Sequence, residues 1–231
     1  MTDVSSALAR RFDVAAANVH TLVNAKATVS GVSAFLSKIT TTADDRVVLY
    51  VNVHNGSAQS GHSATPDSDV MVFWSQDDPR VIEFALAEGK WLLASDFAKM
   101  LHTVEMTELI AIFDACESGA LATEVMHDAA QEGRRVATIA SAQPGQVANL
   151  TQNLKQPLFS SLFANDLANA SAAKHSQSFS TLLTEVTEQT QSRAKQVCAS
   201  RQAQMNEQAG HAVNCDQVPI ISDPTGLLSQ L

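Results

Sequence analysis

Hydrophobic positions along this chain alternate between two periods, one typical of helices and one typical of strands. Segments whose apolar residues recur at helical spacing are 4–11, 28–38, the stretch that follows Ser95, 121–132, 158–168 and 178–204. Segments that are dense in apolar and β-branched residues are 47–53, 70–75, 109–113, 135–142 and 217–222. This alternation predicts an α/β fold, a three-layer α/β/α sandwich around a mainly parallel central sheet.

Two of the expected strands carry the strongest signals. Residues 47–53, VVLYVNV, are rich in β-branched side chains and stop just before an Asn-Gly pair. Residues 109–113, LIAIF, are continuously apolar, as expected for a strand that is covered on both faces. The segment 70–75 is expected to pair in a small hairpin outside the main sheet. Pro219 confines the segment 217–222 to a sheet edge or to a strand end.

Capping residues and composition refine the expected helices. Thr28 and Ser95 are each expected to cap the N-terminus of the helix that follows. Residues 178–204 predict one long, glutamine-rich helix with little apolar face, and residues 20–25 indicate a weak strand or a loop.

Two segments between these elements are expected to be loops. Residues 54–69 are small, polar and glycine-bearing, and residues 143–157 are irregular and polar. Loops beyond strand ends often carry function, so residues 54–69 are a candidate to border a site.

The composition limits the classes of function. The 231 residues are 45% hydrophobic and 17% charged, so residues 1–231 are expected to form a single domain. A net charge of −9 with scattered Lys and Arg argues against nucleic acid as a partner. No apolar run approaches the roughly 20 residues of a membrane-spanning helix, and the N-terminus lacks a signal-peptide pattern. We therefore expect a cytoplasmic protein without a membrane span.

The chain has three cysteines, too few for a disulfide framework, and their spacing is not that of a zinc site. A disulfide between Cys198 and Cys215 is compatible with the sequence, which does not decide it. The combination of His62 with Asp67 and Asp69 matches no standard metal site, so a solvated loop is expected there. We predict neither a metal nor a cofactor.

The remaining cysteine, Cys116, lies just beyond the end of one predicted strand, as His54 lies beyond the end of another. Residues 47–53 lead into His54, and residues 109–113 lead into Asp114 and Cys116. Ligands bind beyond the carboxyl ends of parallel strands, so the two side chains are expected at one rim of the sheet. A thiol beside an imidazole is a candidate nucleophile. The alternative is that Cys116 is a small buried hydrophobe and His54 an ordinary loop residue.

The stretches DDRVVLYVNVHNGS and LIAIFDACESGA together resemble the cysteine peptidases of the caspase-like clan. In that clan one apolar strand ends in His-Gly, and a later strand ends in an acidic or amide residue, any residue, and then Cys. Within the clan, DACESG is most similar to the motifs of legumains and metacaspases. The resemblance covers residues 10–165 and extends weakly to the C-terminal helices and last strand at 166–231. It implies a caspase-like fold.

The resemblance also implies a cysteine endopeptidase whose substrate is a peptide or protein. His54 and Cys116 would form the catalytic dyad and process the substrate through an acyl-enzyme. The backbone N–H groups of Asn55 and Cys116 would bind the oxyanion of the tetrahedral intermediate. Gly56 and Gly119 would be flexible positions beside the dyad.

By the same resemblance Asp114 would line the pocket for the residue that precedes the cleaved bond. A carboxylate there favours Arg or Lys, as in metacaspases, with Asn as the alternative, as in legumain. Ser141 and Gln143 would begin the wall of this pocket. A structural interpretation stays open for Asp114, in which the carboxylate caps the turn after the strand. Loops at 57–69 or 141–157 would host an activating cut by analogy.

Two features depart from the clan's pattern. This chain has Asn55 between His54 and Gly56, where the clan has His-Gly. The clan's first core strand, which precedes the helix at 4–11, has no counterpart. A catalytically inactive binding or regulatory module is therefore an alternative, and a transamidase or ligase would use the same dyad. The sequence leaves the oligomeric state open.

Overall fold

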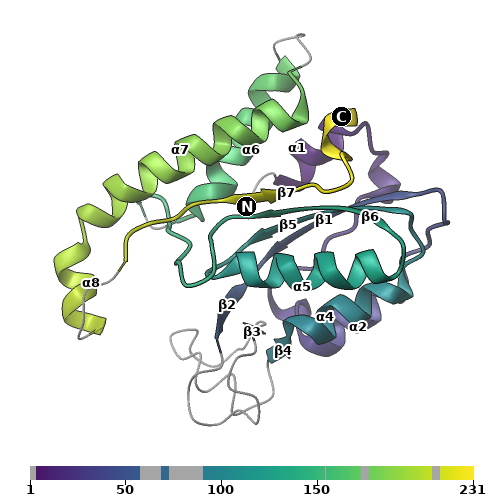
Figure 1. The fold of residues 1–231 in the computed structure, drawn as a ribbon, viewed down its shortest axis with the longest axis horizontal. Helices are drawn as coiled ribbons and strands as arrows, with labels where there is room; N and C mark the ends of the chain where they lie inside the picture. The colour runs from purple at the N-terminus through teal and green to yellow at the C-terminus, as the bar shows by residue number, and fades with distance from the viewer. Residues whose placement is uncertain (1–3, 58–68, 73–90, 154, 173–176, 210–213) are drawn as a thin grey trace.

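The computed structural model describes residues 4–57, 69–72, 91–153, 155–172, 177–209 and 214–231. Its strands form two sheets: a four-stranded sheet with the order β1-β5-β6-β7 and a three-stranded sheet with the order β2-β3-β4. Helices flank the larger sheet on both faces, and the smaller sheet projects from one end of it (Figure 1). The chain is therefore an α/β protein, as the alternating periods predict.

The main sheet is mostly parallel. Its strands are β1 (Arg46–Asn52), β5 (Glu108–Asp114), β6 (Arg135–Ala140) and β7 (Ile220–Ser222). The first three run parallel to one another, and β7 pairs antiparallel with β6 at the edge. Pro219 lies directly before β7, as expected for a proline at a strand end. The prediction of a mainly parallel sheet is confirmed.

The smaller sheet is antiparallel and consists of β2 (His54–Ser57), β3 (Asp69–Val72) and β4 (Trp91–Leu93). A small hairpin outside the main sheet was expected, and β3 provides it. The prediction that the loop begins at His54 is wrong, because the backbone of β2 pairs with β3. Residues 58–68 of the predicted loop and 73–75 of the predicted strand lie outside the described residues.

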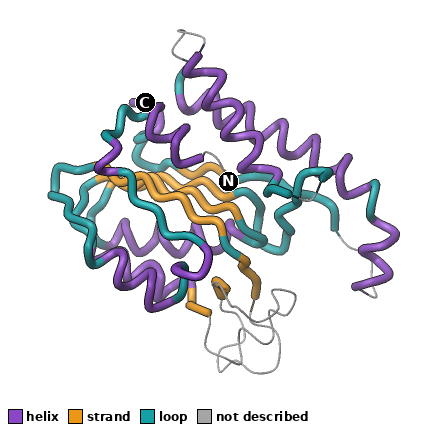
Figure 2. Tube along the Cα trace, turned by 180° about the vertical axis from the view of Figure 1, so that it is seen from behind, coloured by secondary structure: helices purple, strands orange, loops and turns teal. Residues whose placement is uncertain are grey.

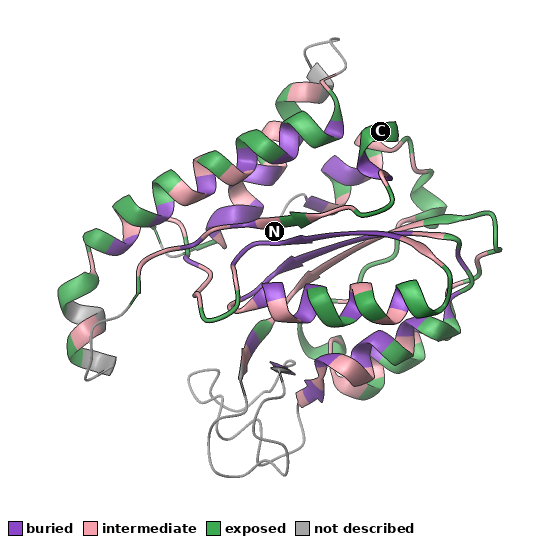
Figure 3. Cartoon of the chain, viewed as in Figure 1, coloured by how far each residue is buried: buried purple, intermediate pink, exposed green. Residues whose placement is uncertain are grey.

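Side chains of β5 supply the core on both faces of the main sheet. Leu109, Ala111 and Phe113 face one core and Ile110 and Ile112 face the other, and all are fully buried. This alternation follows from the two-residue period of a strand. Figure 3 shows the central strands as the most buried part of the chain. The continuous apolar run at 109–113 is thus explained by coverage on both sides.

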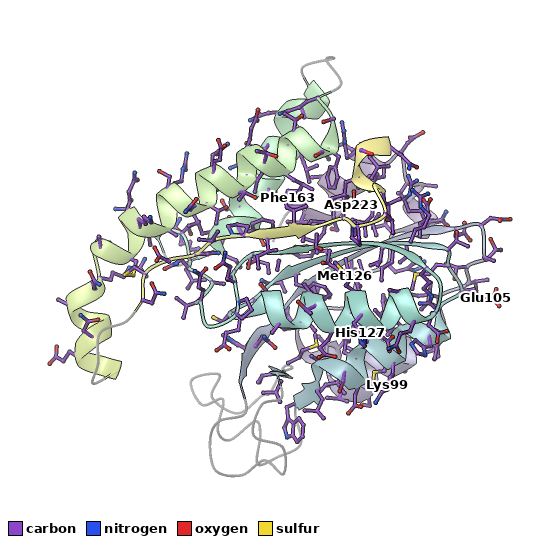
Figure 4. All side chains as sticks on the ribbon, in the orientation of Figure 1. Lys99, Glu105, Met126, His127, Phe163 and Asp223 are labelled. Atoms are coloured by element: carbon purple, nitrogen blue, oxygen red, sulfur yellow. A yellow bond between two sulfur atoms is a disulfide. The ribbon has the colours of Figure 1, made fainter. Side chains whose placement is uncertain are left out.

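Helices α2 (Val29–Leu36), α4 (Ala94–Met100) and α5 (Ser118–Gln131) cover one face of the sheet. Helices α1 (Val4–Arg11), α6 (Leu158–Ala172) and α7 (Phe179–Ala199) cover the other. The view from behind shows the sheet between these two helical layers (Figure 2). In Figure 4, Phe163 lies between the upper helices and the sheet, while Met126 lies between α5 and the sheet.

The shorter helical elements complete the fold. They are α8 (Gln202–Ala209) and the single-turn 3₁₀ helices η1 (Ala16–Asn18), η2 (Asn24–Lys26), η3 (Leu101–Thr103) and η4 (Leu228–Gln230). Residues 20–23 are irregular, so the loop alternative holds for the segment 20–25. No strand precedes β1 among the described residues. Among the described helices, none is long and apolar enough to cross a membrane.

Two expectations about helices are corrected. Thr28 caps α2 as expected, since its hydroxyl accepts a hydrogen bond from the N–H of Gly31 at 3.0 Å. Ser95 does not cap α4, because this helix already begins at Ala94 and its N-cap residue is Leu93. The segment 178–204 is interrupted after Ala199, and α7 does have an apolar face. Its buried residues are Phe179, Leu182, Leu183, Val186, Thr190, Ala194 and Cys198.

A row of opposite charges joins the amino ends of the three parallel strands. Arg46, Glu108 and Arg135 occupy paired positions in β1, β5 and β6. Arg46 donates from Nε to Glu108 Oε2 at 2.6 Å, and Arg135 donates to the other oxygen of Glu108. These side chains are partly exposed, so solvent weakens each pair, but both fit a single register of the strands.

Candidate active site

The carboxyl ends of β1 and β5 lie side by side at the edge opposite the charged row. Asn52 pairs with Asp114 in the parallel ladder, and the Asn52 side-chain amide donates to the Asp114 carbonyl at 2.8 Å. His54 follows Asn52 by two residues, and Cys116 follows Asp114 by two residues. The expected adjacency of the two strands is confirmed, and it brings both candidate residues to one edge.

Asn55 connects the two strand ends directly. Its side-chain amide donates to the backbone carbonyl of Cys116, with 3.0 Å between Nδ2 and O. Asn55 is 4% exposed, and its Oδ1 atom has no hydrogen-bond partner among the described residues. The sequence suggested a role for the Asn55 backbone and missed this side-chain contact. The signal that was available is the insertion of an amide residue where the clan has glycine.

His54 lies at the junction between the two sheets. It is the first residue of β2, is exposed to solvent and pairs with Val72 in β3. Val53 alone separates it from the end of β1. The imidazole is therefore accessible to solvent and to a bound molecule.

Cys116 occupies the turn between β5 and α5. It is the only free cysteine of the chain and is half-buried. The next residue, Glu117, has a left-handed backbone with φ of 52° and is the N-cap of α5. The positive end of a helix dipole stabilises a nearby thiolate. The position of Cys116 just before α5 therefore favours its thiolate form.

The surroundings of the Cys116 sulfur have opposing effects. Burial raises the pKa of the Cys116 thiol, and the nearby carboxylates of Glu117 and Asp114 raise it further. A hydrogen bond from the Ala148 N–H to Sγ, at 3.4 Å, lowers the pKa but is outweighed by burial. The thiol is therefore mostly neutral near pH 7 unless a cationic group such as a protonated imidazole approaches it.

Asp114 is enclosed, with 1% of its surface exposed. Its Oδ2 atom accepts hydrogen bonds from the Ser160 N–H at 3.0 Å and from the Ser160 hydroxyl. Ser160 is the third residue of α6, so Asp114 caps the N-terminus of that helix. The structural interpretation of Asp114 is thus correct in kind, although the capped element is α6 rather than the following turn.

The second oxygen of Asp114 is unused. Oδ1 is buried and has no hydrogen-bond partner among the described residues. Burial raises the pKa of the Asp114 carboxyl, and the hydrogen bonds from Ser160 and the nearby Ser141 hydroxyl, which is not within hydrogen-bond distance of Oδ1, oppose this shift. The Tyr50 hydroxyl bonds to the Ser160 hydroxyl, and burial also raises the pKa of Tyr50. A buried acceptor with no donor is unfavourable, and a ligand donor would satisfy it.

Ser141 and Gln143, the expected start of a pocket wall, follow the end of β6. Ser141 is fully buried, and its hydroxyl accepts from the Ala115 N–H at 3.2 Å. Gln143 is half-buried, and its N–H donates to the side chain of Gln146 at 3.4 Å. Ser141 thus contacts the turn that bears Cys116. The described hydrogen bond of Gln143 is instead to Gln146, within its own loop.

Gly119 has a packing role rather than the flexible role that the resemblance implies. It lies in the first turn of α5, and an added Cβ would come within 2.7 Å of the Pro144 ring. Its N–H donates to the Ala142 carbonyl at 2.8 Å. Gly56, in β2, has open space around its Cα. Glycine at position 119 therefore permits the loop after β6 to pack against α5.

No sequence pattern indicated Gln217, which contacts the loop after β6. Gln217 is fully buried and bonds to Asn149 and to the Ser141 carbonyl. The Cys198–Cys215 disulfide that the sequence left open is formed, two residues before Gln217. Of the residues considered as a metal site, His62 and Asp67 lie outside the described part of the chain.

Comparison with known proteins identified no relative of this chain. No family model matches the chain, and no curated protein matches it.

Proposed function

We propose that this protein is a cysteine endopeptidase of the caspase-like clan, with Cys116 as the nucleophile and His54 as the general acid and base. The observation that carries the proposal is the register of β1 and β5, which ends both strands at one edge. The contact between Asn55 and the Cys116 carbonyl supports it, because it joins the residues that follow the two strands. A mainly parallel sheet between helical layers is compatible with this clan.

In the proposed reaction the Cys116 thiolate attacks the carbonyl carbon of a peptide bond. The new S–C bond forms as the carbonyl electron pair moves to oxygen, where backbone N–H groups of Cys116 and Asn55 would stabilise the charge. The protonated His54 gives its proton to the leaving nitrogen as the C–N bond breaks. Water, deprotonated by His54, then attacks the thioester and releases Cys116 as a thiolate.

The proposed substrate has a basic residue before the cleaved bond. Asp114 offers the buried acceptor Oδ1, while Ser160 holds its other oxygen. A bound cation would compensate the cost of ionising Asp114 in its buried site and would satisfy the unused oxygen. An Asn side chain would instead donate an N–H to this oxygen, so Asn is the second candidate. Because Asp114 is shielded in this state, binding requires displacement of the groups that cover it.

A catalytically inactive binding module is the second candidate function. Two observations favour it: burial raises the pKa of the Cys116 thiol, and the Asp114 carboxylate already caps α6. A transamidase or ligase would share the acyl-enzyme and differ only in the acceptor that attacks it.

A fluorogenic peptide panel tests these candidates. Peptides with Arg, Lys, Asn or Asp before the scissile bond are incubated with the wild type, with Cys116→Ala and with His54→Ala. The peptidase proposal expects release of the fluorophore by the wild type alone, with the highest rate for Arg or Lys. Adding an amine acceptor and detecting the ligated product separates transamidation from hydrolysis. Equal signals from the wild type and Cys116→Ala would leave the inactive module as the better explanation.

A further inference from the structure

Gln217 lies at the centre of a hydrogen-bond group that the proposed reaction does not use. Its side chain has no solvent exposure. Oε1 accepts from the Asn149 backbone N–H at 2.8 Å and from the Asn149 side-chain amide at 3.2 Å. Nε2 donates to the Ser141 carbonyl at 3.1 Å. A buried amide that is bonded on both sides holds the backbone of the loop after β6 in one position.

The same loop contacts the cysteine turn. The Gln146 side chain accepts from the Val218 N–H at 2.8 Å, and the Gln146 carbonyl accepts from the Glu117 N–H at 2.8 Å. The Ala148 N–H donates to the Cys116 sulfur at 3.4 Å. Residues 146–149 are therefore fixed between the chain at 217–218 on one side and the candidate nucleophile on the other.

The segment that bears Gln217 is covalently anchored. Cys215 forms a disulfide with Cys198, a buried residue in the last turn of α7, and the two Cα atoms are 5.4 Å apart. Two residues of extended chain reach at most about 7 Å, so the disulfide restricts how far Gln217 can move from α7. An ion pair between Lys195 of α7 and Asp216, at 3.8 Å, also joins this segment to α7. Because both side chains are exposed, this pair contributes little to holding the segment in place.

We infer that Gln217 is a positioning residue for the Cys116 thiol, and that the Cys198–Cys215 disulfide makes the accessibility of this thiol dependent on redox state. With the disulfide intact, Gln217 holds residues 146–149 against the sulfur. When a dithiol reductant transfers two electrons and two protons, it becomes a disulfide and leaves two thiols at 198 and 215. The segment around Gln217 is then released, and the loop no longer covers Cys116.

The balance of effects on Cys116 gives the direction of the change. Burial is the largest cause of the raised pKa of this thiol, and the Ala148 N–H is the largest opposing one. Release of the loop removes this N–H and reduces the burial, and because burial is the larger cause, we expect the pKa of the thiol to fall. The charged groups that face the sulfur, Glu117 and Asp114, lie on the turn and on β5 and stay in place. Oxidation therefore protects the thiol, and reduction makes it more reactive.

The experiment measures iodoacetamide labelling of Cys116 as a function of pH in the full chain, quantified by mass spectrometry of the peptide that contains Cys116. The proteins are the oxidised wild type, the wild type after dithiothreitol, Cys198→Ser/Cys215→Ser and Gln217→Ala. Gln189→Ala is the matched control, because the Gln189 side chain also makes a hydrogen bond to a residue distant in the sequence, donating to Asp166 at 2.9 Å, and this bond joins α7 to α6 rather than to the loop. Circular dichroism and urea unfolding show which variants are folded.

We expect labelling at pH 7 to be about tenfold faster in the reduced wild type, the double cysteine variant and Gln217→Ala, because a lower thiol pKa leaves more thiolate at this pH. The midpoint of the pH–rate profile falls in the same proteins, and Gln189→Ala matches the oxidised wild type. Equal rates and midpoints in the oxidised wild type and the folded double cysteine variant would overturn the inference. If Gln217→Ala does not fold, the cysteine variant and the reduced wild type still decide.

The regulatory meaning of this link rests on the proposed peptidase function, but labelling does not require catalysis. A peptide panel without cleavage, together with faster labelling after reduction, would reject the peptidase and retain the positioning role of Gln217. If the wild type cleaves peptides but labelling does not depend on the disulfide, the peptidase function would be retained and the redox-dependent positioning by Gln217 would be rejected.

Discussion

The Asn55 side-chain amide donates a hydrogen bond to the backbone carbonyl of Cys116, with 3.0 Å between Nδ2 and O. Asn55 belongs to β2 in the smaller sheet, whereas Cys116 follows β5 in the main sheet. The contact therefore fixes the smaller sheet relative to the turn that bears the thiol. It also shows that the residue between His54 and Gly56 has a structural use.

Replacing Asn55 with Ala should destabilise the protein. The substitution leaves the Cys116 carbonyl without this donor in a half-buried place, so we expect the free energy of unfolding to fall by about 1 to 2 kcal/mol. Urea unfolding followed by circular dichroism measures the change. Asn18→Ala, at an exposed position in η1, serves as the control and should change stability little. An unaltered midpoint for Asn55→Ala would mean that the contact contributes nothing.

The imidazole of His54 should control the reactivity of Cys116. Without a cation nearby, burial keeps the pKa of the Cys116 thiol raised. We therefore expect His54→Ala to slow iodoacetamide labelling of Cys116 at pH 7 about tenfold, since less thiolate is present. The pH dependence of labelling from pH 5 to 10 provides the measurement.

His102→Ala is the matched control for this histidine. His102 bonds to Asp128 of α5 at 2.5 Å, and neither residue contacts the cysteine turn. Labelling of Cys116 in this variant should follow the wild-type profile. A slower reaction in both variants would point to a general loss of structure rather than to an effect of His54.

Replacing Asp114 with Asn should give a difference in stability that depends on pH. Burial raises the folded-state pKa of Asp114 above its ordinary value of 3.8, so the unfolded chain loses this proton first. The wild type therefore loses stability as the pH rises from about 4 through the folded-state pKa. Asp114→Asn has no such loss, and its stability relative to the wild type should increase over that window and then stay constant.

Urea unfolding at pH 4, 5, 6 and 7 measures this difference. Asp44→Asn, at an exposed site, is the control and should run parallel to the wild type. A constant difference between Asp114→Asn and the wild type across the series would show that Asp114 does not titrate with a raised pKa.

Gly119 and Gly56 should respond differently to the same substitution. Alanine normally favours a helix over glycine, but at position 119 its Cβ would lie 2.7 Å from Pro144 Cδ and 3.2 Å from the Ala142 carbonyl oxygen. We expect Gly119→Ala to lower the free energy of unfolding by about 1 to 3 kcal/mol. Gly56→Ala meets open space and should be close to neutral. Thermal unfolding of both variants tests the contrast, which would be refuted by equal melting temperatures.

The parts of the fold that follow from local pattern were predictable. The β-branched run that ends at Asn52 and the apolar run that ends at Phe113 form neighbouring strands, as their composition indicates. The strand at His54–Ser57 was not predictable, because it depends on pairing with β3 and β4. Its own residues, with Asn and Gly among them, favour a turn instead.

The site shows the same division between local and distant causes. The positions of His54 and Cys116 at strand ends are local features, and the sequence indicates them. Gln217 has no local signal, since a single glutamine before a short strand becomes significant only after the chain returns to the loop at 146–149. The Cys198–Cys215 pair likewise depends on how the end of α7 packs beside the segment before β7. Spacing alone does not reveal that arrangement.

The row formed by Arg46, Glu108 and Arg135 bears on the candidate site at the far end of the sheet. Paired strands keep their residues in step, so holding Arg46 level with Glu108 also holds Asn52 level with Asp114, roughly 20 Å away. A two-residue slip of β1, which keeps every side chain on its own face, would shift the imidazole by about 7 Å relative to the sulfur and prevent proton transfer. These surface charges thus help to align the two strands that carry the candidate site, although they do not touch it.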